Sequence, residues 1–460
     1  MSLIKSISGI RGTIGGKAGD NLTPIDLVRF VSAYATIIKQ KAEGRRTRVV
    51  VGRDARVSGQ MVRDIVCGTL VGMGIDVTDI GLATTPTTEI AVTEEKADGG
   101  IIITASHNPM QWNALKMLDS KGEFLTDKVG KEVLRIAAEE AFEAATVEEL
   151  GTVVERDYTD IHIEKALKLE LVDVEAVRKA KLTVGIDTVN SVGGIILPRL
   201  FEKMGVEMKF GLNTEANGRF AHNPEPIPQN LGDICKAVKE SKTDVAFVVD
   251  PDVDRLAIVC EDGELMGEEY TIVSVADYVL SHTKGSTVSN LSSSRALRDV
   301  TEKHGCSYTA AAVGEVNVVT EMRRTGAVIG GEGNGGVIYP ALHYGRDAIV
   351  GIALFLTLMA KSGKKPTELK AGYPQYVISK NRIDLTPDTN VDALLSRIKE
   401  SYKGERITDI DGVKIDFADS WVHLRKSNTE PIIRIYAEAH SEGEAEKLAA
   451  RVKEEIKSLV

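Results

Sequence analysis

Three aspartates that alternate along one short segment are the residues of this chain most clearly suited to chemistry. Asp250, Asp252 and Asp254 stand at positions i, i+2 and i+4, directly after the apolar run Val245–Val249. Carboxylates so close together repel one another unless a cation lies among them, so the spacing predicts a metal site. Because the ligands are all oxygen, with no histidine or cysteine, Mg²⁺ is favoured over Zn²⁺.

Two other interpretations of this segment stay open. Glu261 falls at the twelfth position of an EF-hand counted from Asp250. However, Arg255 stands where that motif needs glycine, and an apolar strand precedes the segment where a helix should be. The second alternative is a solvated acidic turn that binds no metal.

A second candidate is a hydroxyl at the end of another buried strand. The run Gly100–Ile103 is apolar and β-branched, which predicts a short strand, and the residues Thr104–Pro109 follow it. In open α/β sheets ligands bind at this end of the strands, where loop donors stay free. Ser106 is therefore a candidate reactive group, and an ordinary turn is the alternative, since Ser and Asn are common before Pro.

A glycine-rich segment follows a third apolar run. Gly331–Gly336 matches GxGxxG, but Pro340 stands where a dinucleotide site needs a helix, and Gly351–Met359 offers no acidic residue for a ribose. A turn with one carboxylate, Glu332, instead suits hydrogen bonding to sugar hydroxyls while the bare backbone lets the ring approach. A plain flexible turn is the alternative.

A fourth segment concentrates cations and hydroxyls. Arg425–Pro431, with Arg434 shortly after, predicts a phosphate cradle, since the planar Arg fork binds phosphate oxygens with two donors. A solvated polar hairpin is the alternative. Arg11, Arg53 and Lys116 are further cations that could converge on a phosphate.

The elements that must position these segments are predicted from short apolar runs, which come in three pairs between position 48 and position 330. They are Arg48–Val51 and Gly100–Ile103, Leu182–Ile186 and Val245–Val249, and Ser286–Asn290 and Ala327–Gly330. Amphipathic stretches such as Leu231–Val238 lie between them, an alternation typical of parallel sheets with crossover helices. Helix-prone polar stretches at Asp127–Glu149 and Lys361–Lys370 close the first and third units.

From about Gly372 the pattern changes. Val413–Phe417, Trp421–Leu424 and Ile432–Tyr436 predict antiparallel strands with one solvated face. Ser441 and Glu444 form a capping box in front of apolar residues at helical spacing, which predicts a C-terminal helix. The last domain is therefore expected to be α+β and built differently from the others.

Composition limits the possible partners. The chain has 460 residues, a net charge of -10, 43% hydrophobic and 27% charged residues, so several ordinary globular domains are expected and neither nucleic acid nor an anionic membrane is. We expect a cytoplasmic protein, because no export signal and no membrane-spanning apolar run is seen. The scattered cysteines, which favour neither disulfides nor zinc, are Cys67, Cys235, Cys260 and Cys306.

Taken together and in this order, the four segments resemble the loops of the α-D-phosphohexomutase family, and the resemblance covers the whole chain. It implies three similar α/β domains with mixed sheets and crossover helices, and a C-terminal α+β domain, arranged around one central cleft. We expect these domains at 1–152, 153–256, 257–370 and 371–460. The separate construction of the fourth domain suggests a lid.

The resemblance also implies a role for each matching residue. Ser106 would carry the transferable phosphate, and Mg²⁺ would bind to the three aspartates and to a phosphoserine oxygen. Lys116 would transfer protons beside His107. The residues implied to hold the reacting phosphate are Arg11 and Arg255, those implied to contact the sugar are Glu332 and Asn334, and those implied to hold the other phosphate are Arg425, Ser427, Asn428, Thr429 and Arg434.

The implied activity is the interconversion of a hexose or hexosamine 6-phosphate and 1-phosphate through a phosphoserine and a 1,6-bisphosphate, which would also act as activator. Many members have Ser and His where this chain has Asn334 and Gly336, and Val313-Gly314-Glu315 lacks a His that some members have. This variant resembles a branch that acts on glucosamine, mannose or glucose phosphates, of which we expect glucosamine. We expect a monomer or homodimer. A phosphate-ester hydrolase and a non-catalytic sugar-phosphate binder remain the alternatives.

Overall fold

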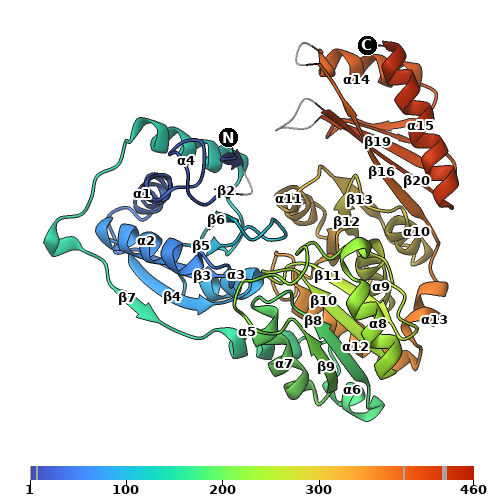
Figure 1. Ribbon diagram of the computed structural model, residues 1–460, viewed down its shortest axis with the longest axis horizontal. Helices are drawn as coiled ribbons and strands as arrows, with labels where there is room; N and C mark the ends of the chain where they lie inside the picture. The colour runs from blue at the N-terminus through green and yellow to red at the C-terminus, as the bar shows by residue number, and fades with distance from the viewer. Residues whose placement is uncertain (1, 7–8, 387–388, 427–431, 460) are drawn as a thin grey trace.

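The computed structural model describes residues 2–6, 9–386, 389–426 and 432–459. This part of the chain forms four sheets, and each sheet is built from one continuous stretch of the sequence. In Figure 1 the first lies at the left in blue, the second at the bottom in green, the third to the right of the centre and the fourth at the upper right in red.

The first sheet has seven strands in the order β1-β2-β6-β5-β3-β4-β7. Its strands are β1 Ile4–Ser6, β2 Gly9–Thr13, β3 Arg48–Arg53, β4 Asp76–Leu82, β5 Gly99–Ile103, β6 Trp112–Leu118 and β7 Val153–Glu155, and its helices are α1 Pro24–Lys41, α2 Gly59–Gly72, α3 Thr85–Glu94 and α4 Asp127–Glu139. The predicted strand before Ser106 is confirmed as the fully buried β5, parallel to β3. The helix expected over Asp127–Glu149 ends early because Glu140 has a left-handed φ of 50° and no buried face continues beyond it.

The second and third sheets have four strands each, in the orders β11-β10-β8-β9 and β13-β12-β14-β15. Their strands are β8 Thr183–Asp187, β9 Glu207–Leu212, β10 Val245–Val249, β11 Leu256–Cys260, β12 Thr287–Asn290, β13 Tyr308–Ala311, β14 Ile329–Glu332 and β15 Gly336–Ile338. Their helices are α5 Thr159–Leu167, α6 Val174–Ala180, α7 Gly193–Met204, α8 Gly232–Ser241, α9 Glu268–His282, α10 Ala296–Lys303, α11 Glu315–Thr325, α12 Ala348–Ser362 and α13 Pro366–Ala371, with a short 3-10 turn at Pro228–Asn230. A further 3-10 turn, Val147–Glu149, precedes β7 of the first sheet. In both sheets three strands are parallel and the last is antiparallel, which gives the expected mixed sheets.

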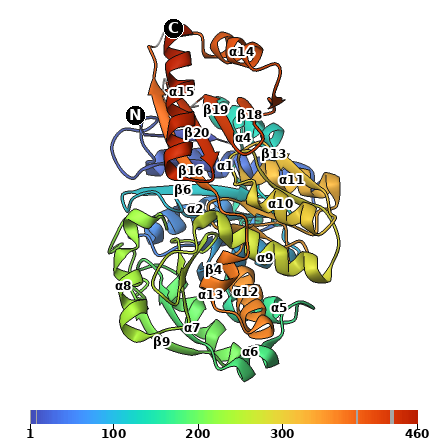
Figure 2. The same cartoon turned by 90° about the vertical axis from the view of Figure 1, so that its right-hand side faces the viewer.

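Helix α12 joins these two sheets into one core. Its residues from Ala348 to Met359 are buried, because the helix is apolar on every side. It packs against α5 and α6 of the second unit and α9 of the third (Figure 2). One continuous cluster of buried side chains therefore runs through both units.

A buried polar junction ties the first three units together at the start of α12. Asp347 caps this helix by accepting hydrogen bonds from Ile349 N and Val350 N. Its Oδ2 also lies 2.9 Å from His162 Nε2, and His162 Nδ1 lies 2.9 Å from Thr87 Oγ1 on α3. The first unit is therefore held against the second and third by specific contacts as well as by the chain.

The fourth sheet is antiparallel, in the order β16-β20-β19-β18-β17. Its strands are β16 Val377–Asp384, β17 Arg406–Thr408, β18 Val413–Asp416, β19 Trp421–Lys426 and β20 Ile432–Ala439, and its helices are α14 Val391–Ser401 and α15 Glu442–Leu459. The predicted capping box is confirmed, since Ser441 Oγ donates to Glu444 Oε2 and accepts from Glu444 N. Strands β16 and β17 were not predicted.

The prediction of a solvated face on this sheet is wrong over much of its length. Trp421, His423 and Glu438 are buried, because this face packs on the third unit. There Arg295 donates to the carbonyl oxygens of Ala418, Phe417 and Ser420 at 2.8–3.1 Å. No helix in the described ranges is both long enough and apolar enough to cross a membrane.

Candidate functional site

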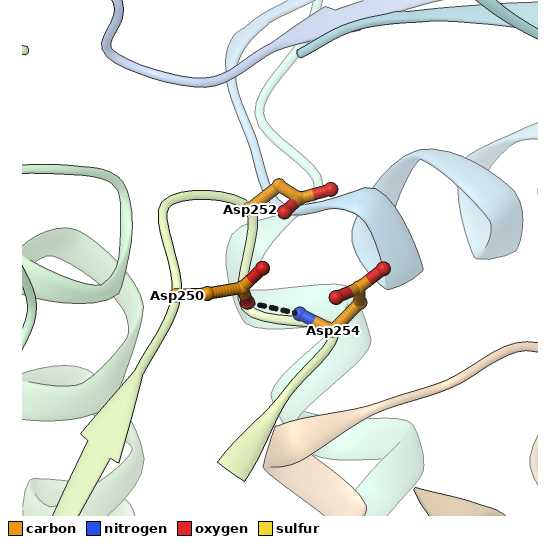
Figure 3. A group of neighbouring side chains, drawn as sticks. All are labelled: Asp250, Asp252 and Asp254. Atoms are coloured by element: carbon orange, nitrogen blue, oxygen red, sulfur yellow. Dashed lines mark hydrogen bonds between the residues drawn. The ribbon is translucent and has the colours of Figure 1, made fainter. Parts of the chain in front are cut away.

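The three predicted aspartates converge at the turn between β10 and β11 (Figure 3). Each offers a carboxylate oxygen, these oxygens lie within 4.8 Å of one another, and all three residues are buried. The turn is held closed by Asp250 Oδ1, which accepts hydrogen bonds from Asp254 N at 3.2 Å and Arg255 N at 3.1 Å. Val253 has a φ of 61° there, a strained conformation for a β-branched residue of the kind that clusters at functional sites.

The hydrogen-bond donors around these carboxylates leave two of the carboxylate oxygens available to a cation. Asp252 Oδ1 and Asp254 Oδ1 are buried and have no hydrogen-bond partner among the described residues. Burial and the two neighbouring aspartates raise the pKa of Asp250 well above its usual range, which expresses how unfavourable three charged carboxylates are without a compensating ion. The site therefore fits a hard, oxygen-binding ion such as Mg²⁺.

Ser106 reaches the same place from the first sheet. Its side chain lies directly beyond β5, and its Oγ donates to Asp250 Oδ2 at 2.7 Å. The residue is buried and has a φ of 47°. His107 Nδ1 lies 3.3 Å from the same hydroxyl, and burial, followed by the charge of Arg255, lowers the pKa of His107 to about 2. The hydroxyl thus lies between a neutral imidazole and the acidic turn.

Arg56, which was not predicted from the sequence, holds the serine loop, residues 104–112, in place. The guanidinium is fully buried and donates to the carbonyl oxygens of Ser106, Asn108, Pro109 and Trp112 at 2.5–2.9 Å. The signal was present in the sequence, because Asp54 and Arg56 stand two residues apart just after a predicted strand. They form a buried ion pair at 3.1 Å.

Replacing Arg56 with methionine is expected to lower the free energy of unfolding by about 3–5 kcal/mol, because it leaves Asp54 buried and unpaired. Hydrogen exchange of the 104–112 amides should rise at the same time. Arg53→Met is the matched control, since among the described residues the half-buried Arg53 donates to Asp54 O and Gln60 Oε1 and to no carbonyl of the loop around Ser106. Equal protection of the loop in the two variants would contradict this role for Arg56.

Lys116 connects the first sheet to the acidic turn. Its Nζ donates to Asp252 Oδ2 at 2.7 Å and lies 3.6 Å from Asp254 Oδ2. Burial lowers its pKa, but the two aspartates outweigh burial and raise it overall. Thr85, on α3, also donates to Asp252 Oδ2 at 2.5 Å. Lys116 is therefore a largely buried, charged donor at the same acidic turn that the Ser106 hydroxyl contacts.

The glycine-rich segment lies at the end of β14, with Glu332 as the last residue of the strand. The Glu332 carboxylate is buried and accepts from Asn290 Nδ2 at 2.8 Å, Gly314 N at 3.2 Å and Arg346 Nη1 at 2.8 Å. Asn334 Oδ1 accepts from Gly336 N and so closes the turn. A short strand, β15, follows in place of the helix that a dinucleotide site would need.

The charges of arginines from two other units act on Arg11 of the first unit. Burial, followed by the charges of Arg434 and Arg255, lowers the pKa of Arg11. Nε of Arg11 and Nε of Arg255 are buried without a hydrogen-bond partner among the described residues. Cations gathered in this way favour an anion among them.

The fourth sheet places a row of arginines on one face. Arg382, Arg434 and Arg425 stand directly opposite one another on β16, β20 and β19, so their side chains share a face and their like charges destabilise the sheet unless anions compensate. Arg425 Nε pairs with Asp411 at 2.8 Å. Arg382 was missed, because only the strand register brings it to this row.

Two expectations of the sequence analysis have other outcomes. Ser427, Asn428 and Thr429 lie outside the described residues. Arg53 is not brought to the site: it lines a separate cavity of about 470 Å³ together with Arg63, Asp79 and Arg156.

Known families match four successive stretches of the chain. The families described as phosphoglucomutase/phosphomannomutase alpha/beta/alpha domains I, II and III and C-terminal domain match residues 3–144, 160–263, 267–376 and 382–455. Together these matches span most of the chain.

Whole proteins and solved structures are similar over nearly the full length. A phosphoglucomutase/phosphomannomutase of Thermococcus kodakarensis is 37% identical over 94% of this chain and 95% of its own. A probable phosphoglucosamine mutase of Pyrococcus abyssi is 33% identical over 98% and 97%. A crystal structure of a phosphoglucomutase/phosphomannomutase family protein from Burkholderia thailandensis has a TM-score of 0.84 and 26% identity, and covers 99% of this chain and 98% of that one.

Proposed function

The chain belongs to the α-D-phosphohexomutase family and is a phosphohexomutase, and we propose that it interconverts glucosamine 6-phosphate and glucosamine 1-phosphate. The 2.7 Å hydrogen bond from Ser106 Oγ to Asp250, which brings a hydroxyl to the acidic turn, carries the proposal of phosphoryl transfer through Ser106. The name of the Pyrococcus relative supports glucosamine phosphates as substrates. Mannose and glucose phosphates are the alternative substrates, favoured by the name of the Thermococcus relative.

The proposed reaction begins with a phosphoryl group on Ser106 Oγ. A sugar hydroxyl attacks the phosphorus, the P–Oγ bond breaks, the new O–P bond forms, and a 1,6-bisphosphate results. One proton leaves the sugar hydroxyl and one reaches Oγ; Lys116 relays it by donating to Oγ and taking the sugar proton in return, so no proton is gained or lost overall. The bisphosphate then turns over, and the same steps run in reverse from its other end. Such transfers depend on positioning and charge neutralisation more than on covalent help.

Residues of the chain have distinct tasks in this scheme. Lys116, whose pKa is raised, stays protonated and can supply the proton that Oγ needs. His107, whose pKa is lowered, stays neutral and so adds no charge beside Oγ, from which its Nδ1 lies 3.3 Å away. Arg11 and Arg255, buried next to them, would hold the oxygens of the reacting phosphate.

We assign the metal to Asp250, Asp252 and Asp254, with Mg²⁺ as the ion. When bound, it supplies positive charge that neutralises the phosphoryl oxygens. The two carboxylate oxygens without hydrogen-bond partners support this assignment. A hexose 1,6-bisphosphate would serve as activator by phosphorylating Ser106.

The phosphate that is not reacting is assigned to the arginine row of the fourth sheet. Arg425 and Arg434 face each other across β19 and β20, and their guanidinium forks suit phosphate oxygens. A lid movement of the fourth sheet stays a prediction. Such a movement would have to break or carry along the hydrogen bonds from Arg295 of the third unit to this sheet's loop carbonyls.

The activity is tested by supplying each sugar phosphate with Mg²⁺ and a trace of bisphosphate, and measuring both the isomer formed and free phosphate. We expect isomer without stoichiometric phosphate release, and the largest kcat/KM on glucosamine phosphates. Stoichiometric phosphate would indicate a hydrolase, and no turnover on any sugar would indicate a binder. A higher kcat/KM on mannose or glucose phosphates would overturn the glucosamine assignment alone.

A further inference from the structure

One buried guanidinium connects the acidic turn to the glycine-rich turn. Arg346 Nη2 donates to Asp254 Oδ2 at 2.6 Å, and Nη1 donates to Glu332 Oε2 at 2.8 Å. Its Nε lies 3.2 Å from Glu315 Oε2, and its backbone N–H donates to Glu315 Oε1 at 2.8 Å. The residue is only 8% exposed. A single cation therefore pairs with three carboxylates from separate segments.

The planar shape of the side chain matters for this arrangement. Each of the two terminal nitrogens of a guanidinium has two N–H groups at fixed angles, so the two carboxylates it binds are held at a fixed separation and orientation. A lysine ammonium is a point charge on a flexible stem and would fix neither. Asp254 Oδ1, to which no described residue donates a hydrogen bond, and the Glu332 carboxylate are thereby held at fixed positions relative to each other.

The glycine-rich turn makes space for this side chain. A Cβ on Gly336 would lie 2.3 Å from Arg346 Cδ and 3.0 Å from Arg346 Cγ, closer than any real Cβ contact, and the stem of Arg346 is enclosed. Gly336 has no positive φ, so its lack of a side chain serves this close approach and not an unusual backbone conformation.

We propose that Arg346 is a positioning residue, which holds the sugar-contacting carboxylate of Glu332 at a fixed place relative to Asp254 of the acidic turn. Gly336 is required because a side chain at this position would occupy the space of the Arg346 stem. The inference rests on the proposed function, which assigns Asp254 to the metal, and on the sugar contact that the family resemblance implies for Glu332. The alternating aspartates alone indicate neither the role of Arg346 nor the need for glycine at position 336.

The first test is chemical rescue of Arg346→Ala. We expect kcat to fall about 10²-fold, because displacement of catalytic groups by about 1 Å has that effect. Without divalent cations, the calorimetric Kd for glucosamine 6-phosphate should rise about tenfold, since a hydrogen bond to a charged group is weakened. About 50 mM guanidinium chloride, far below unfolding concentrations, should restore both, and methylammonium chloride should not.

Arg324→Ala is the matched control for the added salt. Arg324 is exposed and pairs with Glu321 on the same helix, so its loss should leave kcat and Kd unchanged, with and without guanidinium. If Arg346→Ala folds, as judged by circular dichroism, and guanidinium restores neither quantity, the positioning role is wrong.

The second test uses the close approach of Gly336. Gly336→Ala should lower kcat about tenfold or more in the wild-type background, because the new methyl group displaces Arg346. In the Arg346→Ala background the same change should have no effect, because the side chain it meets is gone. Equal losses in both backgrounds would overturn the proposal. If Arg346→Ala does not fold, the single variant decides: unchanged kcat and Kd in Gly336→Ala would also overturn it.

These outcomes separate the inference from the proposed function. An inactive wild-type protein contradicts the proposed function. If the wild type is active but guanidinium does not rescue Arg346→Ala, or Gly336→Ala costs the same in both backgrounds, only the positioning role is contradicted.

Discussion

Ser106→Ala will lower kcat by a factor on the order of 10⁴ or more and leave the fold intact. The change removes the oxygen that accepts and returns the phosphoryl group, and nucleophile losses of this kind have effects of at least that size. The structural loss is small, because the side chain makes one close hydrogen bond, to Asp250, and one longer contact, to His107. The measurement is turnover of glucosamine 6-phosphate in a coupled assay, with circular dichroism to confirm folding.

Ser281→Ala is the matched control for this prediction. Ser281 lies on α9, and its hydroxyl donates to Tyr278 O in its own helix. Its kcat should equal that of the wild type. A Ser106→Ala protein that retains more than about a tenth of wild-type turnover would contradict the assignment of the phosphoryl carrier.

Asp252→Asn will weaken Mn²⁺ binding and lower kcat about 10²–10³-fold, because the cation contributes several kcal/mol to neutralising the phosphoryl charge. Asp252 is the best single target. Within the described ranges one of its oxygens accepts no hydrogen bond, and the other accepts from Lys116 and Thr85. The change therefore removes a ligand and also releases the protonated lysine. Electron paramagnetic resonance of free Mn²⁺ gives the affinity, and steady-state assays give kcat.

Asp262→Asn controls for the loss of one acidic group nearby. Asp262 follows β11, and its carboxylate accepts a hydrogen bond from Glu264 N in an exposed turn. It should bind Mn²⁺ as the wild type does. Unchanged Mn²⁺ affinity in Asp252→Asn would show that the aspartates form a hydrogen-bonded turn and not a metal site.

Much of the fold could be predicted because it depends on local patterns. The apolar run Val245–Val249 coincides with β10, residue for residue. The Ser441 and Glu444 pair begins the C-terminal helix by the predicted contacts. Buried parallel strands and capping boxes carry their signal within a few residues, which is what a sequence displays directly.

Features that depend on distant segments could not be predicted. Arg346 looked like an ordinary charged residue, since Asp254, one of its carboxylate partners, is 92 positions away. The face of the fourth sheet carries polar residues at alternate positions, so it predicted solvent, but the third unit covers it. Arg53 was grouped with the phosphate-binding cations, although its side chain points to α2 and Gln60.

The alternation of aspartates and the serine at a strand end are a middle case. Each was recognisable by itself, but their contact joins positions 144 residues apart. Ser106 follows the carboxyl end of β5 in the first sheet, and the aspartates follow the carboxyl end of β10 in the second. The hydroxyl and the carboxylates meet because these two strand ends face the same space.

The most direct measurement follows one phosphoryl group. The dephosphorylated protein is mixed with Mg²⁺ and 1,6-bisphosphate labelled with radioactive phosphorus, and the label is located by mass spectrometry of its peptides. It is then chased with unlabelled glucosamine 6-phosphate. We expect one label per chain, at Ser106, and we expect this label to be transferred to the sugar during the chase. A label at another residue, or one released as free phosphate, would contradict it.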